Sequence, residues 1–242
     1  MCVRVVCARP AHSPVQEALR EDHHARRRQR WRRQDNARHR AGRRRRSRSP
    51  DLRVGLADLD PQGSLTQWWN DRALPQPLLF DLAARTLAAA KRELRASGLD
   101  LLILDCPPSF SAVLLKAIAA SDLVQVPSGA SVLDLAAVSS TAAMATRAGV
   151  PYRFVLNRAV FRSRIAGQAV GVLRERGGLL WPPVHQRVSI AAAMAAGRTA
   201  LETEPRSAAA RELSALWRAV WACLNEVAAG PLTRIAGERR RA

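Results

Sequence analysis

Two short apolar segments, each ending in an aspartate, set the strongest limit on how this 242-residue chain can fold. The first is Val54–Asp58 (VGLAD) and the second is Leu99–Asp105 (LDLLILD). Continuous apolar runs of this length are typical of strands that are buried on both faces. Because such strands occur in parallel sheets that helices cover, the two segments predict an α/β fold.

The rest of the chain after Leu52 supports this prediction, because apolar strand-like runs alternate with segments of helical spacing. We expect helices over residues 82–96, 111–120, 133–148, 165–176 and 206–228, and further strands over 123–126, 153–157 and 179–181. The expected architecture is a mostly parallel sheet with helices on both faces.

Positive charge is distributed unevenly along the chain. The formal net charge is +19, and residues 1–50 alone hold 16 arginines against four acidic residues. Residues 20–50 show neither a helical nor a strand period, which predicts a disordered basic arm able to bind nucleic acid through phosphates. We therefore divide the chain into an arginine-rich segment (1–50), a folded domain (51–230) and a basic tail (231–242).

Several classes of protein are not indicated. No run of about 18 apolar residues occurs, so a membrane-spanning helix is not expected. Pro10 and His12 lie where a signal peptide needs a long apolar stretch. The four cysteines form no CxxC pair, which argues against a zinc site or a disulfide framework. We expect a cytoplasmic protein with no membrane association.

The segment DLDPQG, residues 58–63, contains the first candidate site. Asp58 and Asp60 lie at the carboxyl end of the first strand, where α/β folds bind ligands. Such a pair could hold Mg²⁺ directly or through water and orient a nucleophile, or it could be a turn with solvated acids. Trp68 and Trp69 follow, and because adjacent residues do not share a helix face, we expect one of them to be exposed.

The second candidate is LLILDCPP, residues 101–108, which has the form of a Walker B strand. Apolar residues carry Asp105 to the strand tip, where its carboxylate can position Mg²⁺ through the water shell of the ion. The two prolines end the strand and stiffen the following loop. The combination with DLDPQG, about 45 residues upstream, is more specific than either motif alone.

Four segments in this order, VGLADLDPQG, LLILDCPPS, SDLVQVPSGASVLDL and FVLNR, resemble the ParA/MinD group of deviant-Walker P-loop ATPases. The resemblance is strongest to small ParA-type plasmid and chromosome partition proteins and covers about residues 52–228. It implies that Asp60 takes part in water activation and Mg²⁺ binding. It also implies that Asp58 lies beside the metal and that Asp105 is the Walker B residue.

Other roles implied by the resemblance concern the basic residues of the second half. Asn157 and Arg158 resemble the side of the site that holds the nucleotide base. Arginines that could contact DNA phosphates are Arg158, Arg162, Arg164 and Arg187, although each could equally belong to a solvated basic face. The implied activity is ATP hydrolysis with Mg²⁺ by a homodimer that binds DNA without sequence specificity. A ParB-like partner and a location on the nucleoid are also implied.

The defining element of that family is missing. A loop of the form KGGxGKTT should precede DLDPQG, but no Gly-Lys pair occurs in this chain. Without its glycines and lysines, the backbone cradle and the positive charge for the phosphates are lost. We therefore expect weak ATP binding and a sheet that lacks its first strand.

We hypothesise that residues up to about 48 are translated out of frame. With one permitted choice of codons, a shift of one nucleotide turns residues 29–36 into KGGVGKTT. Residues 22–25 can become IITL, a strand, and residues 37–42 can become LATALA, a helix. The second lysine of this shifted loop, at position 34, would lie 26 positions before Asp60. The alternative is a non-catalytic nucleic-acid-binding protein that uses the arginine-rich arm as it stands.

Overall fold

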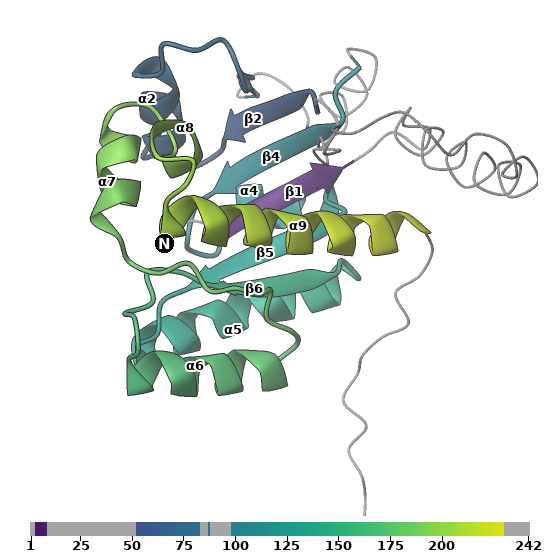
Figure 1. Cartoon of the computed structure of the whole chain (residues 1–242). Helices are drawn as coiled ribbons and strands as arrows, with labels where there is room; N and C mark the ends of the chain where they lie inside the picture. Colours follow the sequence, from purple (N-terminus) through teal and green to yellow (C-terminus); the bar gives the residue numbers. More distant parts are fainter. Residues whose placement is uncertain (1–2, 9–51, 83–86, 88–97, 230–242) are drawn as a thin grey trace, which may run out of the picture.

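The computed structural model describes residues 3–8, 52–82, 87 and 98–229, and within them a six-stranded sheet forms the centre of the molecule (Figure 1). The strand order is β3-β2-β4-β1-β5-β6. The strands are β1 (Val3–Ala8), β2 (Val54–Asp58), β3 (Leu78–Leu79), β4 (Leu101–Cys106), β5 (Leu123–Ser128) and β6 (Tyr152–Leu156). The pairs β2–β3, β2–β4 and β5–β6 are parallel, which confirms the predicted α/β class.

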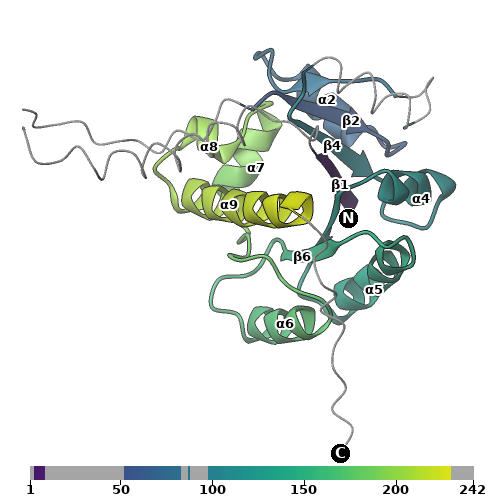
Figure 2. The ribbon, with the colours of Figure 1, turned by 90° about the vertical axis from the view of Figure 1, so that its right-hand side faces the viewer.

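Helices cover both faces of the sheet. They are α2 (Ser64–Asn70), α4 (Ala112–Ala119), α5 (Val132–Arg147), α6 (Arg164–Glu175), α7 (Val188–Ala195), α8 (Ala200–Thr203) and α9 (Ala208–Ala229). Figure 2 shows α9 on one side of the sheet and α4 and α5 on the other. None of the helices in the described part of the chain is long and apolar enough to span a bilayer.

Side chains that alternate along the strands form two cores. In β4, Leu102 and Leu104 pack in the larger cluster with residues of α4, α5 and α6. Leu101 and Ile103 pack in the smaller cluster with Val220 and other residues of α9. The burial on both faces explains why the strands read as continuous apolar runs rather than as alternating ones.

The sheet does not lack a strand between β4 and β5, so our expectation of an incomplete sheet is wrong in this respect. Val3–Ala8 occupies this position and pairs with both neighbours. It runs antiparallel to them, and in Figure 1 its arrow points the opposite way. Backbone N–H and C=O groups that lack hydrogen-bond partners inside a sheet are costly, and the backbone of a strand of either direction can supply the partners. The valines of Val3–Ala8 favour the extended conformation that this requires. Residues 9–51, which hold the rest of the arginine-rich segment, lie outside the described residues.

Most of the other elements follow the sequence prediction, but β3 was not predicted. The strand expected over 179–181 is a single bridge between Leu179 and Phe154. The helix expected over 82–96 lies almost wholly outside the described residues. Neither α2 nor the segment from α7 to α8 was predicted. Trp68 and Trp69, of which one was expected to be exposed, are both half-buried.

Candidate functional site

The two predicted carboxylates at the strand ends lie next to each other. β2 and β4 are parallel neighbours, and their register pairs Asp58 with Asp105. Because side chains alternate along β4, Asp105 lies on the same face as Leu101 and Ile103, which is the face that α9 covers. Asp58 shares this face through its register with Asp105. The structure therefore brings these two predicted site residues together at the carboxyl edge of the sheet.

Hydrogen bonds to the backbone fix the loop that follows β2. The Asp58 carboxylate accepts from the N–H of Asp60 (3.1 Å) and from the N–H of Thr66 (2.9 Å). Asp60 in turn accepts from the N–H of Gln62 (3.0 Å). Gly63 closes the turn with φ +64°, a left-handed conformation that glycine adopts without strain. The loop therefore forms an ordered turn that leads into α2.

Burial distinguishes the three carboxylates. Asp60 is 8% exposed and Asp105 is 6% exposed, and few other polar residues of the described chain are buried to this extent. Asp58 is only half-buried, and each of its oxygens accepts a backbone N–H. Its first role is thus to hold the loop and the first turn of α2.

The donor set fits Mg²⁺ only in part. Carboxylate oxygens are the ligands that Mg²⁺ prefers, and the ion is usually held by one or two carboxylates together with water and substrate phosphates. Among the described residues, no three His, Cys, Asp or Glu side chains are close enough to form a metal cluster. Asp60 and Asp105 are therefore suited to a hydrated ion that phosphates also coordinate, and a cage made by the protein alone is not present there.

The phosphate side of a nucleotide site is where the fit fails. The sequence contains no Gly-Lys pair, and its two lysines are Lys91 and Lys116. Lys116 lies in the last turn of α4, a helix that begins beyond the proline loop that follows β4. Residues 29–36, in which we hypothesise a shifted reading frame, lie outside the described residues. We therefore derive no chemical step through a bound nucleotide.

Asn157 and Arg158 lie in the loop that leaves β6. The N–H of Asn157 donates to the carbonyl oxygen of Ser128 at the end of β5 (2.8 Å). Its side-chain oxygen accepts from the N–H of Arg158 (2.9 Å), which has a left-handed φ of 53°. Both side chains are exposed. Asn157 thus shapes a turn at the same edge of the sheet as the aspartates.

The arginines proposed for DNA differ in their surroundings. Arg158 and Arg162 are exposed on the connection between β6 and α6, Arg164 is exposed at the first position of α6, and Arg162 lies over the ring of Phe161. Arg187 is instead half-buried and forms an ion pair with Glu212 of α9.

Glu212 was not predicted as part of this region. Its carboxylate also contacts His185 Nδ1 (3.0 Å). Burial raises the pKa of Glu212, but the hydrogen bonds from Arg187 and from the His185 backbone lower it, and the pKa is lowered overall. Its 25-residue separation from Arg187 gives no local pattern in the sequence that could have revealed it.

The geometry defines an α/β protein with a mostly parallel sheet and two buried aspartates, Asp60 and Asp105, where strands β2 and β4 end. The Mg-ADP complex of the septum site-determining protein MinD from Pyrococcus horikoshii has this fold, with a TM-score of 0.56 and 16% identity. The similarity covers 73% of this chain and 86% of that one. At this identity the likeness establishes the fold alone.

Sequence similarity identifies the family. The chain is 31% identical over 212 residues to the chromosome-partitioning ATPase Soj of Thermus thermophilus, covering 72% of this chain and 85% of Soj. It therefore belongs to the ParA/MinD family of ATPases, as the resemblance predicted. It is also 39% identical over 131 residues to the maintenance of carboxysome distribution protein A of Gloeobacter kilaueensis, of which the match spans 59%. No family model matches the chain.

Proposed function

We propose that this chain derives from a ParA-type partition ATPase that segregates plasmid or chromosomal DNA. One observation carries the proposal. Asp58 and Asp105 are paired in register at the carboxyl edge of the sheet, and Asp60 follows Asp58 by two residues. The chain that carries them matches Soj over 85% of the length of Soj. Positioning of a carboxysome is the second candidate within the family, and it rests on a match over a smaller part of the relative.

In this proposal the three carboxylates have separate roles. Bound Mg-ATP would supply the phosphoanhydride bond and the cation that neutralises its charge. Asp60, buried beside the strand end, would accept a hydrogen bond from the attacking water and orient it. Asp105 would face the water shell of the ion, and Asp58 would hold the loop that carries Asp60.

The remaining parts of the proposal concern the assembly. Residues 51–230 form the ATPase domain and residues 231–242 a basic tail. Two copies pair, and exposed arginines (Arg158, Arg162 and Arg164) bind DNA phosphates without sequence specificity on the nucleoid. A ParB-like protein stimulates hydrolysis. In this chain the residues up to about 48 are out of frame, so ATP binding is impaired because the phosphate loop is missing.

The test compares two proteins by release of inorganic phosphate from Mg-ATP. One is this chain, and the other carries IITL, KGGVGKTT and LATALA in place of residues 22–25, 29–36 and 37–42. We expect hydrolysis only in the restored protein, falling at least about 100-fold in its Asp60→Asn variant. A restored protein that is folded by circular dichroism yet neither binds nor hydrolyses ATP would overturn the proposal. ATP-dependent DNA binding by the restored protein tests the assembly.

A further inference from the structure

The helix that follows the Asp58–Gly63 loop is held by a few contacts at its two ends and by the indole N–H groups of Trp68 and Trp69, which donate to the carbonyl oxygens of Arg198 and Pro77. α2 has seven residues, none of them buried, and spans about 10 Å. A helix of this length is not stable alone and depends on tertiary contacts. Its first turn is tied to β2 by the bond from the Thr66 N–H to Asp58. The position of α2, and of the loop before it, therefore depends on what holds the other end.

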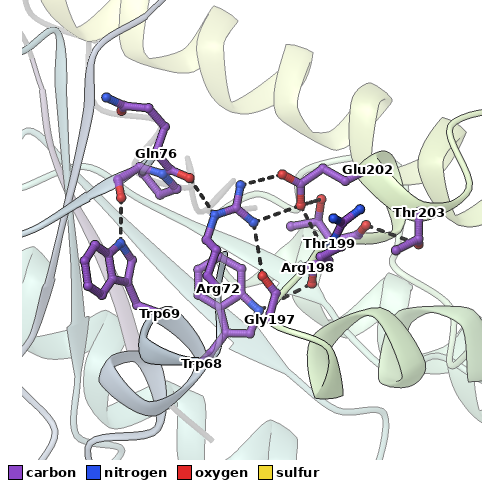
Figure 3. A network of polar contacts seen from close by, with 10 residues as sticks. Trp68, Trp69, Arg72, Gln76, Gly197, Arg198, Thr199, Glu202 and Thr203 are labelled. Carbon is purple, nitrogen blue, oxygen red and sulfur yellow. Dashed lines mark hydrogen bonds and ion pairs between the residues drawn. The ribbon is translucent and has the colours of Figure 1, made fainter. Parts of the chain in front are cut away.

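Arg72, two residues beyond α2, holds that end (Figure 3). Its side chain is only 7% exposed. Nε donates to the Gln76 carbonyl oxygen (2.5 Å), and Nη1 donates to the Gly197 carbonyl oxygen (3.2 Å). The two terminal nitrogens form a forked pair with the carboxylate of Glu202, with Nη1 at 3.0 Å from Oε2. The guanidinium also lies over the ring of Trp68, 5.3 Å from its centre.

The partner surface is the turn between α7 and α8, and it is itself ordered. Glu202 accepts from the Thr199 N–H (2.8 Å) and hydroxyl (3.0 Å), which closes a capping box at the start of α8. The indole N–H of Trp68 donates to the Arg198 carbonyl oxygen (3.3 Å). At Gly197 an added Cβ would lie 2.7 Å from the Arg72 backbone nitrogen and closer still to the Asp71 carbonyl group. The two segments are therefore in backbone contact.

We propose that the Arg72–Glu202 pair is a positioning link through which the α7–α8 turn sets the position of Asp60. Asp60 is bound to Asp58 and, through Gln62 and Gly63, to the start of α2, so the loop and the helix move together. A change at the α7–α8 turn is passed through Arg72 to α2 and from there to the loop. The catalytic meaning of this link rests on the proposed function, because it assumes that Asp60 acts on water.

Hydrogen–deuterium exchange of the full chain tests the link without any nucleotide. In Glu202→Gln and Arg72→Met we expect the amides of Gln62, Gly63 and Thr66 to exchange about tenfold faster than in the parent protein. Glu212→Gln is the matched control, because it breaks a comparable arginine pair on α9 and should leave those amides unchanged. Faster exchange confined to residues 72–77 and 197–203 would show a merely local contact and overturn the proposal.

Two further variants keep the test decisive if one substitution unfolds the chain. Arg72→Lys keeps the positive charge but loses the pair of hydrogen bonds to the Glu202 carboxylate. It should therefore speed exchange at the three amides by a smaller factor than Arg72→Met does. The double variant Arg72→Met/Glu202→Gln should exchange no faster there than the worse single variant, because both changes remove one link. Additive effects of the two changes contradict the link. Since none of these readouts uses ATP, their failure is distinct from failure of the restored protein to hydrolyse it.

Discussion

Asp58 of β2 and Asp105 of β4 are paired in register on neighbouring parallel strands, and the two carboxylate oxygens of Asp58 accept the backbone N–H groups of Asp60 and Thr66. The two residues therefore have different roles although they stand side by side. Asp58 organises the loop, whereas Asp105 is buried at the strand end.

Replacing Asp58 with alanine should destabilise the protein even where no nucleotide is present. The change removes the acceptor for the N–H groups of Asp60 and Thr66, and the loss of a capping acceptor costs about 1–2 kcal/mol. Urea unfolding at neutral pH measures this cost. Asp58→Asn, which keeps one acceptor oxygen, serves as the comparison and should lose less. Equal stability of Asp58→Ala and the parent protein would show that the carboxylate does not hold the loop.

The antiparallel β1 makes a prediction about backbone hydrogen bonding. Val5 pairs with Leu104 on one side and Val124 on the other. Val5→Pro removes a backbone donor from the interior of the sheet and should cost at least about 2 kcal/mol of unfolding free energy. Val5→Ile keeps the donor and should be close to neutral. If the proline variant unfolds at the same urea concentration as the parent, Val3–Ala8 does not occupy the centre of the sheet in solution.

Acid should weaken the contact between Arg72 and Glu202. The hydrogen bonds from Arg72, helped by those from Thr199, lower the pKa of Glu202 from 4.5 to about 2 against the opposing effect of burial. The stabilisation is therefore complete above pH 4.5 and is lost as the pH falls from 4.5 towards 2. The gap in unfolding free energy between the parent and Glu202→Gln should shrink by roughly half between pH 7 and pH 3. A gap that is the same at both pH values contradicts this assignment.

For the proposed DNA binding, the surroundings of the arginines predict which of them contribute. Arg162 is exposed, so Arg162→Ala should weaken DNA binding uniformly across sequences and reduce the salt slope by about 1. Arg187 is paired with Glu212, which raises the pKa of Arg187, so Arg187→Ala should lower stability more than affinity. Fluorescence anisotropy with labelled duplexes over a range of salt concentrations measures both. The reverse order of effects would place the phosphate contacts on Arg187.

The rival view, in which the arginine-rich arm binds nucleic acid by itself, gives a different result in the same assay. Removal of residues 1–50 would then abolish binding, and the affinity of this chain for nucleic acid would fall steeply with salt but would not change with ATP. Since removal also deletes β1, the matched control removes residues 9–50 only and keeps Val3–Ala8. Binding that survives the shorter deletion contradicts the rival view.

The sequence was sufficient for the parts of the fold that depend on local pattern. Val54–Asp58 is a strand as predicted, and the register of two parallel strands explains why Asp58 and Asp105 meet. Other features depend on contacts between distant segments. Val3–Ala8 takes its place because β4 and β5 leave a gap that a strand of either direction can fill. Arg72 and Glu202 are 130 residues apart, so no spacing rule connects them.

We propose that a family ATPase has lost its phosphate loop to a shift of the reading frame, and the coding DNA across residues 20–52 tests this most directly. Trp has a single codon, so the shifted codon at Trp31 encodes glycine whatever the neighbouring codons are. Resequenced and read in the shifted frame, the DNA should encode an apolar strand, a loop of the KGGVGKTT type and a helix. A shifted frame that encodes no such loop would contradict the claim and leave this chain as a relative without a phosphate loop.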